Sequence, residues 1–396
     1  MISWVMKTRG LLPIGLDLGH NSIKMIQVMV NGEQLSVIAA QKTHIDHSIS
    51  DEQEKSRFII SAVKRMHTEG HFHGNNVISS LPNDGLEITS LRLAETQSDV
   101  IEQALRKEVV QRFGLDPDED AMQYLIAGNV HQGDEIKNEL ILFAAANQTI
   151  KSHIELLEQA GLKPVSIDTI PHALFRSFER SLRRQEDRER TVVFVDVGNK
   201  YTTVVFGRGG EISFVKQIPV GGEKFNEEIA LKVGVEVKEA AMLREALQME
   251  KSSVTPKPDL LEQPVEVHEQ KLEPSTRQAI VDAVSAVAEE LTREISLCLR
   301  YYTVTFRGKR VEQAFFTGGG AYEYILLDVL KRQLAVEVEV AQPLKGFSMS
   351  REKGNMKFDS DRRGLLCEWA VAIGLSLKGS KRAENVNPKS SKEIQV

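Results

Sequence analysis

This polypeptide of 396 residues has few cysteines, no long hydrophobic run and no excess of basic charge. Its two cysteines, Cys298 and Cys367, lie in apolar patterns that predict core packing, and so few cysteines are typical of a reducing compartment. No stretch reaches the roughly 18 apolar residues that a membrane-spanning helix needs, and Met1 to Gly10 lacks a signal-peptide pattern. The net charge of −6 disfavours a protein that coats nucleic acid. We expect a cytoplasmic protein with two or more domains.

The first half of the chain begins with a pattern of short strands joined by turns. Asn31-Gly32 is a strong hairpin signal, because both residues tolerate positive φ, and Asp51 is a typical helix N-cap. Strands are expected at 13–19, 22–30, 34–41 and 76–81, with a helix from Asp51 to about Glu69 before the last of them.

A second pattern interrupts this first half at 84–162. Its order of strand, helix, two strands and helix predicts a compact α/β insert. After it, 165–170 is expected to form a strand and Pro171 to lie in the first turn of a helix. The insert leaves the preceding turns uninterrupted, so it is predicted to be an addition to the first half.

The second half repeats the opening of the first. Ile14–Gly19 lines up with Val193–Gly198, and each segment runs from an apolar strand through Asp, an apolar residue and Gly into a tight turn and another strand. The repeat distance is far too long for a solenoid. It indicates a duplicated α/β fold of two lobes with a binding site between them.

Two further glycine turns occur in the second half. Gly221-Gly222-Glu223 ends a strand and opens a helix, and Gly318-Gly319-Gly320 follows the strand at 314–317. The triple glycine is either a plain strand-to-helix turn or a bare backbone surface for a base or ribose. Glu223 either contacts a ribose or favours the helix dipole. A long helix is expected from Pro274 to about Tyr302.

The paired Asp-x-Gly turns carry the chemistry. A carboxylate at the end of a strand can hold Mg²⁺ through its waters, and the Gly lets backbone N–H groups approach a polyphosphate. One such turn is commonly an ordinary hairpin, but two at corresponding places of a duplicated frame indicate a site. The first turn adds Ser22 and Lys24, and the second adds Asn199, Thr202 and Thr203.

These segments resemble the superfamily of actin, sugar kinases and heat-shock chaperones. Asp17–Lys24 resembles its first phosphate motif, Asp196–Thr203 its second and Thr317–Tyr322 its adenosine motif, while 221–225 is similar to the chaperones' adenosine-side turn. Within it the chain resembles the PilM family from about residue 13 to 378. The markers are Gly15–Lys24, Ser80-Leu81-Pro82, Gly161–Val165, Gly318–Ala321, Val338–Pro343 and Ala370–Leu375.

The resemblance implies a duplicated actin-like (ribonuclease H-like) α/β fold that binds ATP and Mg²⁺. The magnesium ligands would be Asp17 and Asp196, through water. The nucleotide-binding residues would be Asp17, Gly19, His20, Asn21, Ser22, Lys24, Asp196, Gly198, Asn199, Thr202, Gly222, Glu223, Gly318, Gly319 and Gly320. The implied division is a first lobe at 11–83 and 163–190, an inserted subdomain of the FtsA and PilM type at 84–162, a second lobe at 191–222 and 303–378, a helical subdomain at 223–302 and a disordered tail at 379–396.

Three departures from the family pattern concern the phosphate turns and catalysis. His20-Asn21 and Asn199-Lys200 stand where small or hydroxyl residues are usual. Ile170 stands before Pro171 where relatives that hydrolyse ATP often carry a water-ordering Glu, so we expect at most a weak ATPase. Asp168 is expected on the same strand face as Ile170 by alternation, and a substitute role for it is disfavoured.

The resemblance also implies a partner: the N-terminal tail of a PilN-like inner-membrane protein, bound near the insert. The chain would then be a cytoplasmic adaptor at the inner face of the inner membrane, in a type IV pilus or a type II secretion-like assembly, with self-association left open. The alternatives are an FtsA-like filament-forming division protein and a sugar or acetate kinase. The polar segment 379–396 lacks the apolar face of an FtsA membrane helix, and no motif supplies a kinase base.

Overall fold

The computed structural model describes residues 9–46, 49, 51–94, 97–132, 135–180, 190–252, 272–306, 310–349 and 365–379. Most of the predicted tail at 379–396 lies outside the described residues. Within the described part, no helix is both long enough and apolar enough to cross a membrane.

The first lobe is built on a sheet with the strand order β15-β4-β3-β2-β5-β9, and β1 pairs with β3. The predicted meander is confirmed, and Asn31 pairs with Gln34 across a turn in which Gly32 has φ of 64°. Asp51 caps the following helix by accepting from the Glu54 N–H at 2.7 Å. The elements are β1 (Arg9–Leu11), β2 (Ile14–Leu18), β3 (Ser22–Asn31), β4 (Gln34–His44), α1 (Glu52–Glu69), β5 (Asn76–Ser80), α3 (Asn147–Gln159), β9 (Lys163–Asp168) and β15 (Ser348–Met349).

The second lobe repeats this topology. Its order β12-β11-β10-β13-β14 places three antiparallel strands beside two parallel ones, as β4-β3-β2-β5-β9 does in the first lobe. The predicted duplication is therefore confirmed at the level of strand order. The elements are β10 (Thr191–Val197), β11 (Thr202–Arg208), β12 (Glu211–Ile218), α5 (Gly222–Val233), α6 (Val237–Ser252), α7 (Pro274–Thr305), β13 (Val311–Thr317), α8 (Tyr324–Gln333) and β14 (Glu337–Val340).

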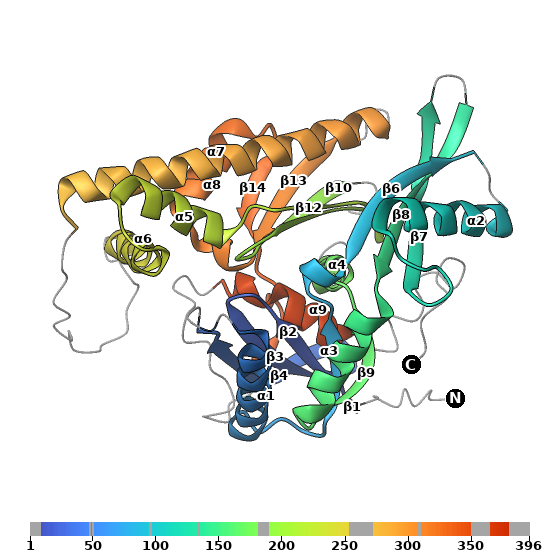
Figure 1. Cartoon of the computed structure of the whole chain (residues 1–396), viewed down its shortest axis with the longest axis horizontal. Coiled ribbons are helices and arrows are strands. Elements are labelled where there is room, and N and C mark those ends of the chain that lie inside the picture. Colours follow the sequence, from blue (N-terminus) through green and yellow to red (C-terminus); the bar gives the residue numbers. More distant parts are fainter. Residues whose placement is uncertain are drawn as a thin grey trace, which may run out of the picture.

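Two helices lie between the sheets, α4 (Ile170–Glu179) and α9 (Ala370–Lys378) (Figure 1). They approach each other so closely that a Cβ on Gly374 would lie 1.7 Å from the Ala173 carbonyl oxygen. On its other side α4 packs on the second sheet, where Phe178 stacks on Phe194 with ring centroids 4.9 Å apart. The lobes are thus joined through a helical layer that has no room for a larger side chain at Gly374.

The insert forms its own three-stranded sheet, in the order β6-β8-β7. Its elements are β6 (Glu87–Leu93), α2 (Ser98–Glu108) with a π-helical end (Val109–Phe113), β7 (Ala121–Gln132) and β8 (Glu135–Ala145). Although the chain enters it from the first lobe, its side chains Leu86, Ile141 and Phe143 share a core with residues of the second sheet such as Val205 and Val215. By packing, the insert belongs with the second lobe (Figure 1).

Helix α3 behaves differently from the rest of segment 84–162. Its Leu157 lies in the core of the first lobe together with Ile14 and Val63. The unit that packs on the second lobe therefore ends near Ala145, and the chain returns to the first lobe with α3. The division of the chain into subdomains remains a prediction, and this packing places the end of the insert earlier than residue 162.

A buried polar network fastens the insert to the second lobe. Glu139 of β8 is 1% exposed, and it accepts from Arg92 Nε at 2.7 Å and from the Tyr301 hydroxyl of α7 at 2.9 Å. Arg92 also donates to the Thr305 hydroxyl at 3.0 Å. A carboxylate so deeply buried needs its partners, because an unpaired buried charge costs several kcal/mol.

Glu139→Ala should lower the free energy of unfolding by about 2 kcal/mol, because Arg92 and Tyr301, both partly exposed, lose the charged acceptor that they share. Glu135→Ala is the matched control on the same strand. Its side chain is 71% exposed and pairs with Lys137 at 3.3 Å, so the change should stay below about 0.5 kcal/mol. Urea unfolding measures both, and equal effects would contradict the fastening role.

Candidate functional site

The first Asp-x-Gly turn joins β2 to β3. Gly19 N–H donates to the Ser22 carbonyl at 3.0 Å and closes the turn. Asp17 and Lys24 face each other across the two strands, with Lys24 Nζ 2.9 Å from Asp17 Oδ2 and each side chain 10% exposed. Burial alone would lower the pKa of Lys24, but the carboxylates of Asp17, Glu368 and Asp196 outweigh it and the pKa is raised. Lys24 is therefore charged and surrounded by acids.

The second turn repeats this geometry between β10 and β11. Gly198 N–H donates to the Tyr201 carbonyl at 3.0 Å. Asp196 pairs with Thr203 at the register position that Lys24 holds in the first turn, so this turn has no lysine opposite its acid. Asp196 accepts from the Thr317 hydroxyl at 2.9 Å. Burial and the nearby Asp17 raise the pKa of Asp196 to about 6, against the Thr317 hydrogen bond.

Immediately around the two aspartates the charges do not balance. Two carboxylates, Asp17 and Asp196, stand close enough for one to raise the pKa of the other, and Lys24 is the cation between them. Such a donor set fits a hydrated magnesium ion, which prefers oxygen ligands and keeps several of its waters. Within the described ranges no cluster of three or more His, Cys, Asp or Glu side chains could hold a metal ion directly.

The triple glycine packs on the second turn. Gly318 has φ of 83°, and a Cβ there would lie 2.5 Å from the Val197 carbonyl oxygen and 2.7 Å from Asp196 Oδ1. A Cβ on Gly320 would lie 2.3 Å from Val197 Cγ1, whereas one on Gly319 would meet nothing within 4 Å. Packing thus explains Gly318 and Gly320, and Gly319 leaves an open backbone surface.

The turn Gly221-Gly222-Glu223 also packs on the second Asp-x-Gly turn. Gly222 N–H donates to the Gly198 carbonyl at 2.9 Å, and Glu223 N–H to the Asn199 carbonyl at 2.7 Å. A Cβ on Gly221 would lie 2.6 Å from the Asn199 carbonyl oxygen. The glycine turns of the second lobe therefore converge around Gly198. The Glu223 side chain is exposed beside them, and both of its expected roles stay predictions.

Helix α6 brings residues that the sequence analysis did not single out. Arg244 Nη1 donates to the Gly222 carbonyl at 2.7 Å, and its guanidinium lies 5.6 Å from the centroid of the Phe225 ring. Gln248, one helical turn later, donates to Glu323, which follows the triple glycine. The i, i+4 spacing of two polar residues on one face was the available signal. It did not reveal which turn they would meet.

Other predicted residues have different surroundings. Thr202 is fully buried and its hydroxyl donates to the Val220 carbonyl at 2.7 Å, inside the lobe. Thr203 accepts from the Asn83 amide at 3.4 Å. Ser22 is buried, and the backbone carbonyl of Asn21 accepts from Ile45 N–H at 2.9 Å. The structure therefore groups Asp17, Lys24 and Asp196 with the glycine turns, and turns the Thr202 hydroxyl away.

The rim of the two turns is linked by Asp84, which lies in a single 3₁₀ turn (Asn83–Gly85) before β6. Its Oδ2 is 3.1 Å from His20 Nε2 and 3.0 Å from Lys200 Nζ. The His20 and Tyr201 rings are 5.9 Å apart. His20 belongs to the first turn and Lys200 and Tyr201 to the second, so the turns face each other across Asp84.

The expected strand at 165–170 ends earlier than predicted. Strand β9 stops at Asp168, Thr169 caps α4, and Ile170 is the first helical residue. The inference that Ile170 and Asp168 share a strand face was wrong, because the N-cap intervenes. Asp168 is held by Arg176 at 2.8 Å and Lys378 at 3.8 Å, and these cations keep its pKa well below the usual range despite burial.

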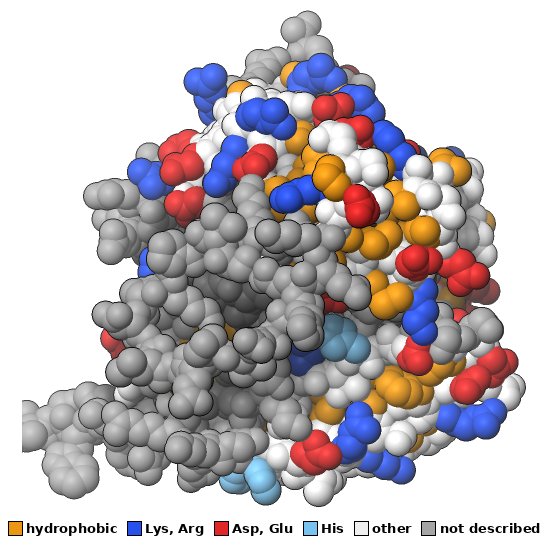
Figure 2. Space-filling model, turned by 90° about the vertical axis from the view of Figure 1, so that its left-hand side faces the viewer, with side chains coloured by type: hydrophobic (Ala, Val, Ile, Leu, Met, Phe, Trp, Pro, Cys, Tyr) orange, Lys and Arg blue, Asp and Glu red, His pale blue; other side chains and the backbone are white. Residues whose placement is uncertain are grey.

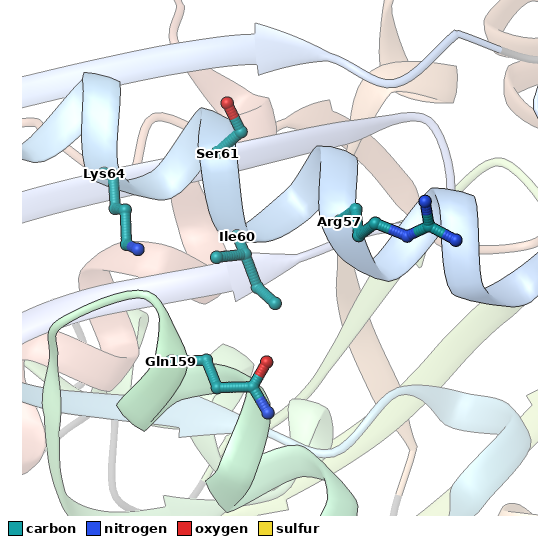
Figure 3. A pocket seen from close by; sticks show the side chains of 5 residues that line it. All are labelled: Arg57, Ile60, Ser61, Lys64 and Gln159. Carbon is teal, nitrogen blue, oxygen red and sulfur yellow. The ribbon is translucent and has the colours of Figure 1, made fainter.

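An open hollow elsewhere on the first lobe lies between α1 and α3 (Figure 3). Its lining residues are Arg57, Ile60, Ser61, Lys64 and Gln159. None of these belongs to the glycine turns or the paired aspartates. The face of the molecule in Figure 2 carries acidic and basic side chains intermixed with hydrophobic ones. The described residues of that face offer no field of one sign to steer a polyanion.

A family model of the type IV pilus assembly protein PilM matches residues 15–380. Among solved structures, a PilM–PilN type IV pilus biogenesis complex has a TM-score of 0.71 at 21% identity, over 93% of this chain and 98% of that one. The ethanolamine utilization protein EutJ from Carboxydothermus hydrogenoformans has a TM-score of 0.52 at 13% identity, over 93% and 89%. The duplicated fold is thus the actin-like one expected from the sequence, and the chain belongs to the PilM family of type IV pilus assembly proteins.

Proposed function

We propose that this protein is an ATP-binding adaptor of a type IV pilus or type II secretion-like assembly, which docks the N-terminal tail of a PilN-like inner-membrane protein. The observation that carries the nucleotide site is the pairing of Asp17 and Asp196 on matching turns of two lobes, with a raised pKa at Asp196. A buried acid and a half-buried one, with one lysine between them, favour a bound cation.

In this proposal the backbone N–H groups of the two turns bind the phosphates, and Mg²⁺ neutralises their charge. The open backbone at Gly319 takes the base or ribose, with Arg244 and Gln248 ordering the surrounding turns. Because the phosphates touch both lobes, binding holds the lobes together. The ligand thereby stabilises the folded, closed protein, as any ligand of the native state does.

Asp196→Asn should raise the stability of the nucleotide-free protein and lower its affinity for Mg-ATP. The folded pKa is raised, so ionisation costs stability increasingly as pH rises from about 4 to 6. At pH 7 the Asn variant should therefore be more stable without nucleotide by about 2 kcal/mol, and at pH 4 it should match the wild type. The Asn oxygen can still accept from Thr317.

The same variant should bind Mg-ATP at least about ten-fold more weakly, because it loses the carboxylate that faces the metal. Melting curves and calorimetry measure the two effects, with the exposed Asp99→Asn as control. Equal Mg-ATP affinities for wild type and Asp196→Asn would show that the site is misplaced.

We also propose that hydrolysis is slow. Ile170 packs against Ile78, Ala173 and Val371, an apolar cluster that cannot order water. Asp168 is occupied by Arg176 and Lys378. Neither residue is available as a base, so the nucleotide acts mainly as a structural ligand.

Turnover should fall below the roughly 1 s⁻¹ at the lower end of typical enzymes. Ile170→Glu should raise it by restoring a group that polarises water, and Ile170→Leu should leave it unchanged. Phosphate release under saturating Mg-ATP is the measurement. Turnover within the enzyme range that disappears in Asp17→Asn would contradict a structural role for the nucleotide.

The adaptor role is supported by the family and by the insert. A solved relative is a PilM–PilN complex, and the insert offers the outer edges of β6 and β7 to an extended peptide. The insert also exposes apolar side chains, among them Val110 at 51% and Ile126 at 42%. A tail bound there would bring a cytoplasmic protein to the inner membrane.

Val110→Glu or Ile126→Glu should weaken binding of a synthetic PilN-like tail peptide about ten-fold, measured by fluorescence anisotropy. Leu231→Glu on α5, at a side chain 80% exposed, is the control outside the insert. Deleting the insert is a poor test, because Ile141 and Phe143 belong to a core shared with the second lobe. Unchanged binding by both insert variants would place the docking site elsewhere.

A further inference from the structure

Asp84 connects three separate parts of the chain at the rim of the two turns. It lies in the turn Asn83–Gly85, which leads from the first lobe into the insert, and it contacts His20 at 3.1 Å and Lys200 at 3.0 Å. The side chains of Asp84 and Lys200 are 43% and 45% exposed, and that of His20 is 24% exposed. A solute can therefore reach this group without any unfolding.

The state of Asp84 is fixed by its partners. Burial would raise its pKa, but hydrogen bonds from Tyr201, His20 and Lys200 outweigh this and lower the pKa to about 2. Asp84 is therefore a full negative charge at neutral pH. It draws the His20 and Lys200 side chains toward itself from opposite lobes.

His20 and Lys200 are also the basic side chains with which the two turns can bind an anion. The turn sequences 17–24 and 196–203 contain three basic residues, His20, Lys24 and Lys200. Lys24 is committed to Asp17 at 2.9 Å. A phosphate that enters between the turns must draw on His20 and Lys200, and it meets Asp84 as a competitor of the same charge.

We propose that Asp84 is an internal counter-anion that the terminal phosphate of a bound nucleotide displaces. This inference rests on the proposed nucleotide site and assigns its regulation. His20 and Lys200 exchange a carboxylate for a phosphate, and Asp84 is released at the entrance to the insert. The carboxylate thus lowers nucleotide affinity and makes the strand that follows, β6, sensitive to occupancy.

The neighbouring Asn83 determines which contacts change when Asp84 is released. Its amide donates to the Thr203 hydroxyl at 3.4 Å and accepts from Gln217 Nε2 at 3.0 Å, on β11 and β12. Those contacts hold the turn on the second lobe when a phosphate displaces Asp84 from His20 and Lys200. The exchange therefore breaks the contact of Asp84 with His20, which ties this turn to the first lobe.

A rival role for Asp84 is a static latch that holds the lobes closed for the ligand. The two roles predict opposite signs. Removing a competitor tightens Mg-ATP binding, whereas removing a latch weakens it. Asp84→Asn separates them because it keeps the size of the side chain and removes its charge.

With Asp84→Asn we expect Mg-ATP affinity to rise about five-fold or more, and affinity for AMP, which lacks the terminal phosphates, to stay within about two-fold. Glu87→Gln is the matched control, since Glu87 is an exposed acid three residues along the same segment. Calorimetry of the full-length protein, with melting curves to confirm folding, gives the comparison.

A double-mutant cycle adds a readout that a structural role would not move. Lys200→Ala should cost more Mg-ATP affinity in the Asp84→Asn background than in the wild type, because Lys200 is then no longer tied to Asp84. Binding that is unchanged or weakened by Asp84→Asn would overturn this inference alone. Failure of the wild type and all variants to bind Mg-ATP would overturn the proposed function, and the inference with it.

Discussion

The interaction on which the structure depends is the charge arrangement of Asp17, Lys24 and Asp196. Duplicated strand pairs place the two carboxylates at matching register positions on different lobes. One acid has its lysine at 2.9 Å, and the other has the Thr317 hydroxyl at 2.9 Å and a pKa raised to about 6. Such an acid lowers the stability of the folded protein, and in the proposed function a cation-bearing ligand offsets that loss.

The insert gives this arrangement a second consequence. In the sequence the insert interrupts the first lobe, yet its Ile141 and Phe143 pack with the second lobe. Its Glu139 accepts a hydrogen bond from the Tyr301 hydroxyl of α7 at 2.9 Å. Any change in how the lobes meet must therefore alter the junction where the chain enters the insert. Asp84 lies at that junction and touches both turns. His20 and Lys200, the two bulky residues noted in these turns, both contact Asp84.

The sequence predicted what depends on neighbouring residues. Asn31-Gly32, the Asp51 cap, Pro171 and the paired Asp-x-Gly turns are local signals, and the structure has a turn, a helix start or a strand end at each. It did not predict what depends on distant contacts. Arg244 was overlooked because its partner Gly222 lies on another helix. Ile170 was placed on a strand although Thr169 and Pro171 are local signals of a helix start. Likewise, chain order placed the insert with the first lobe, and side-chain packing placed it with the second.

Hydrogen exchange of backbone amides, with and without Mg-ATP, tests the central claim most directly. Amides that bind phosphate or become covered by a ligand exchange more slowly. The account predicts that Mg-ATP slows exchange in segments 17–24, 196–203, 221–223 and 318–322, on both lobes at once, and leaves α1 and α3 around the hollow of Figure 3 unchanged. Slowing confined to one lobe, or found only around that hollow, would contradict a nucleotide held between the paired turns.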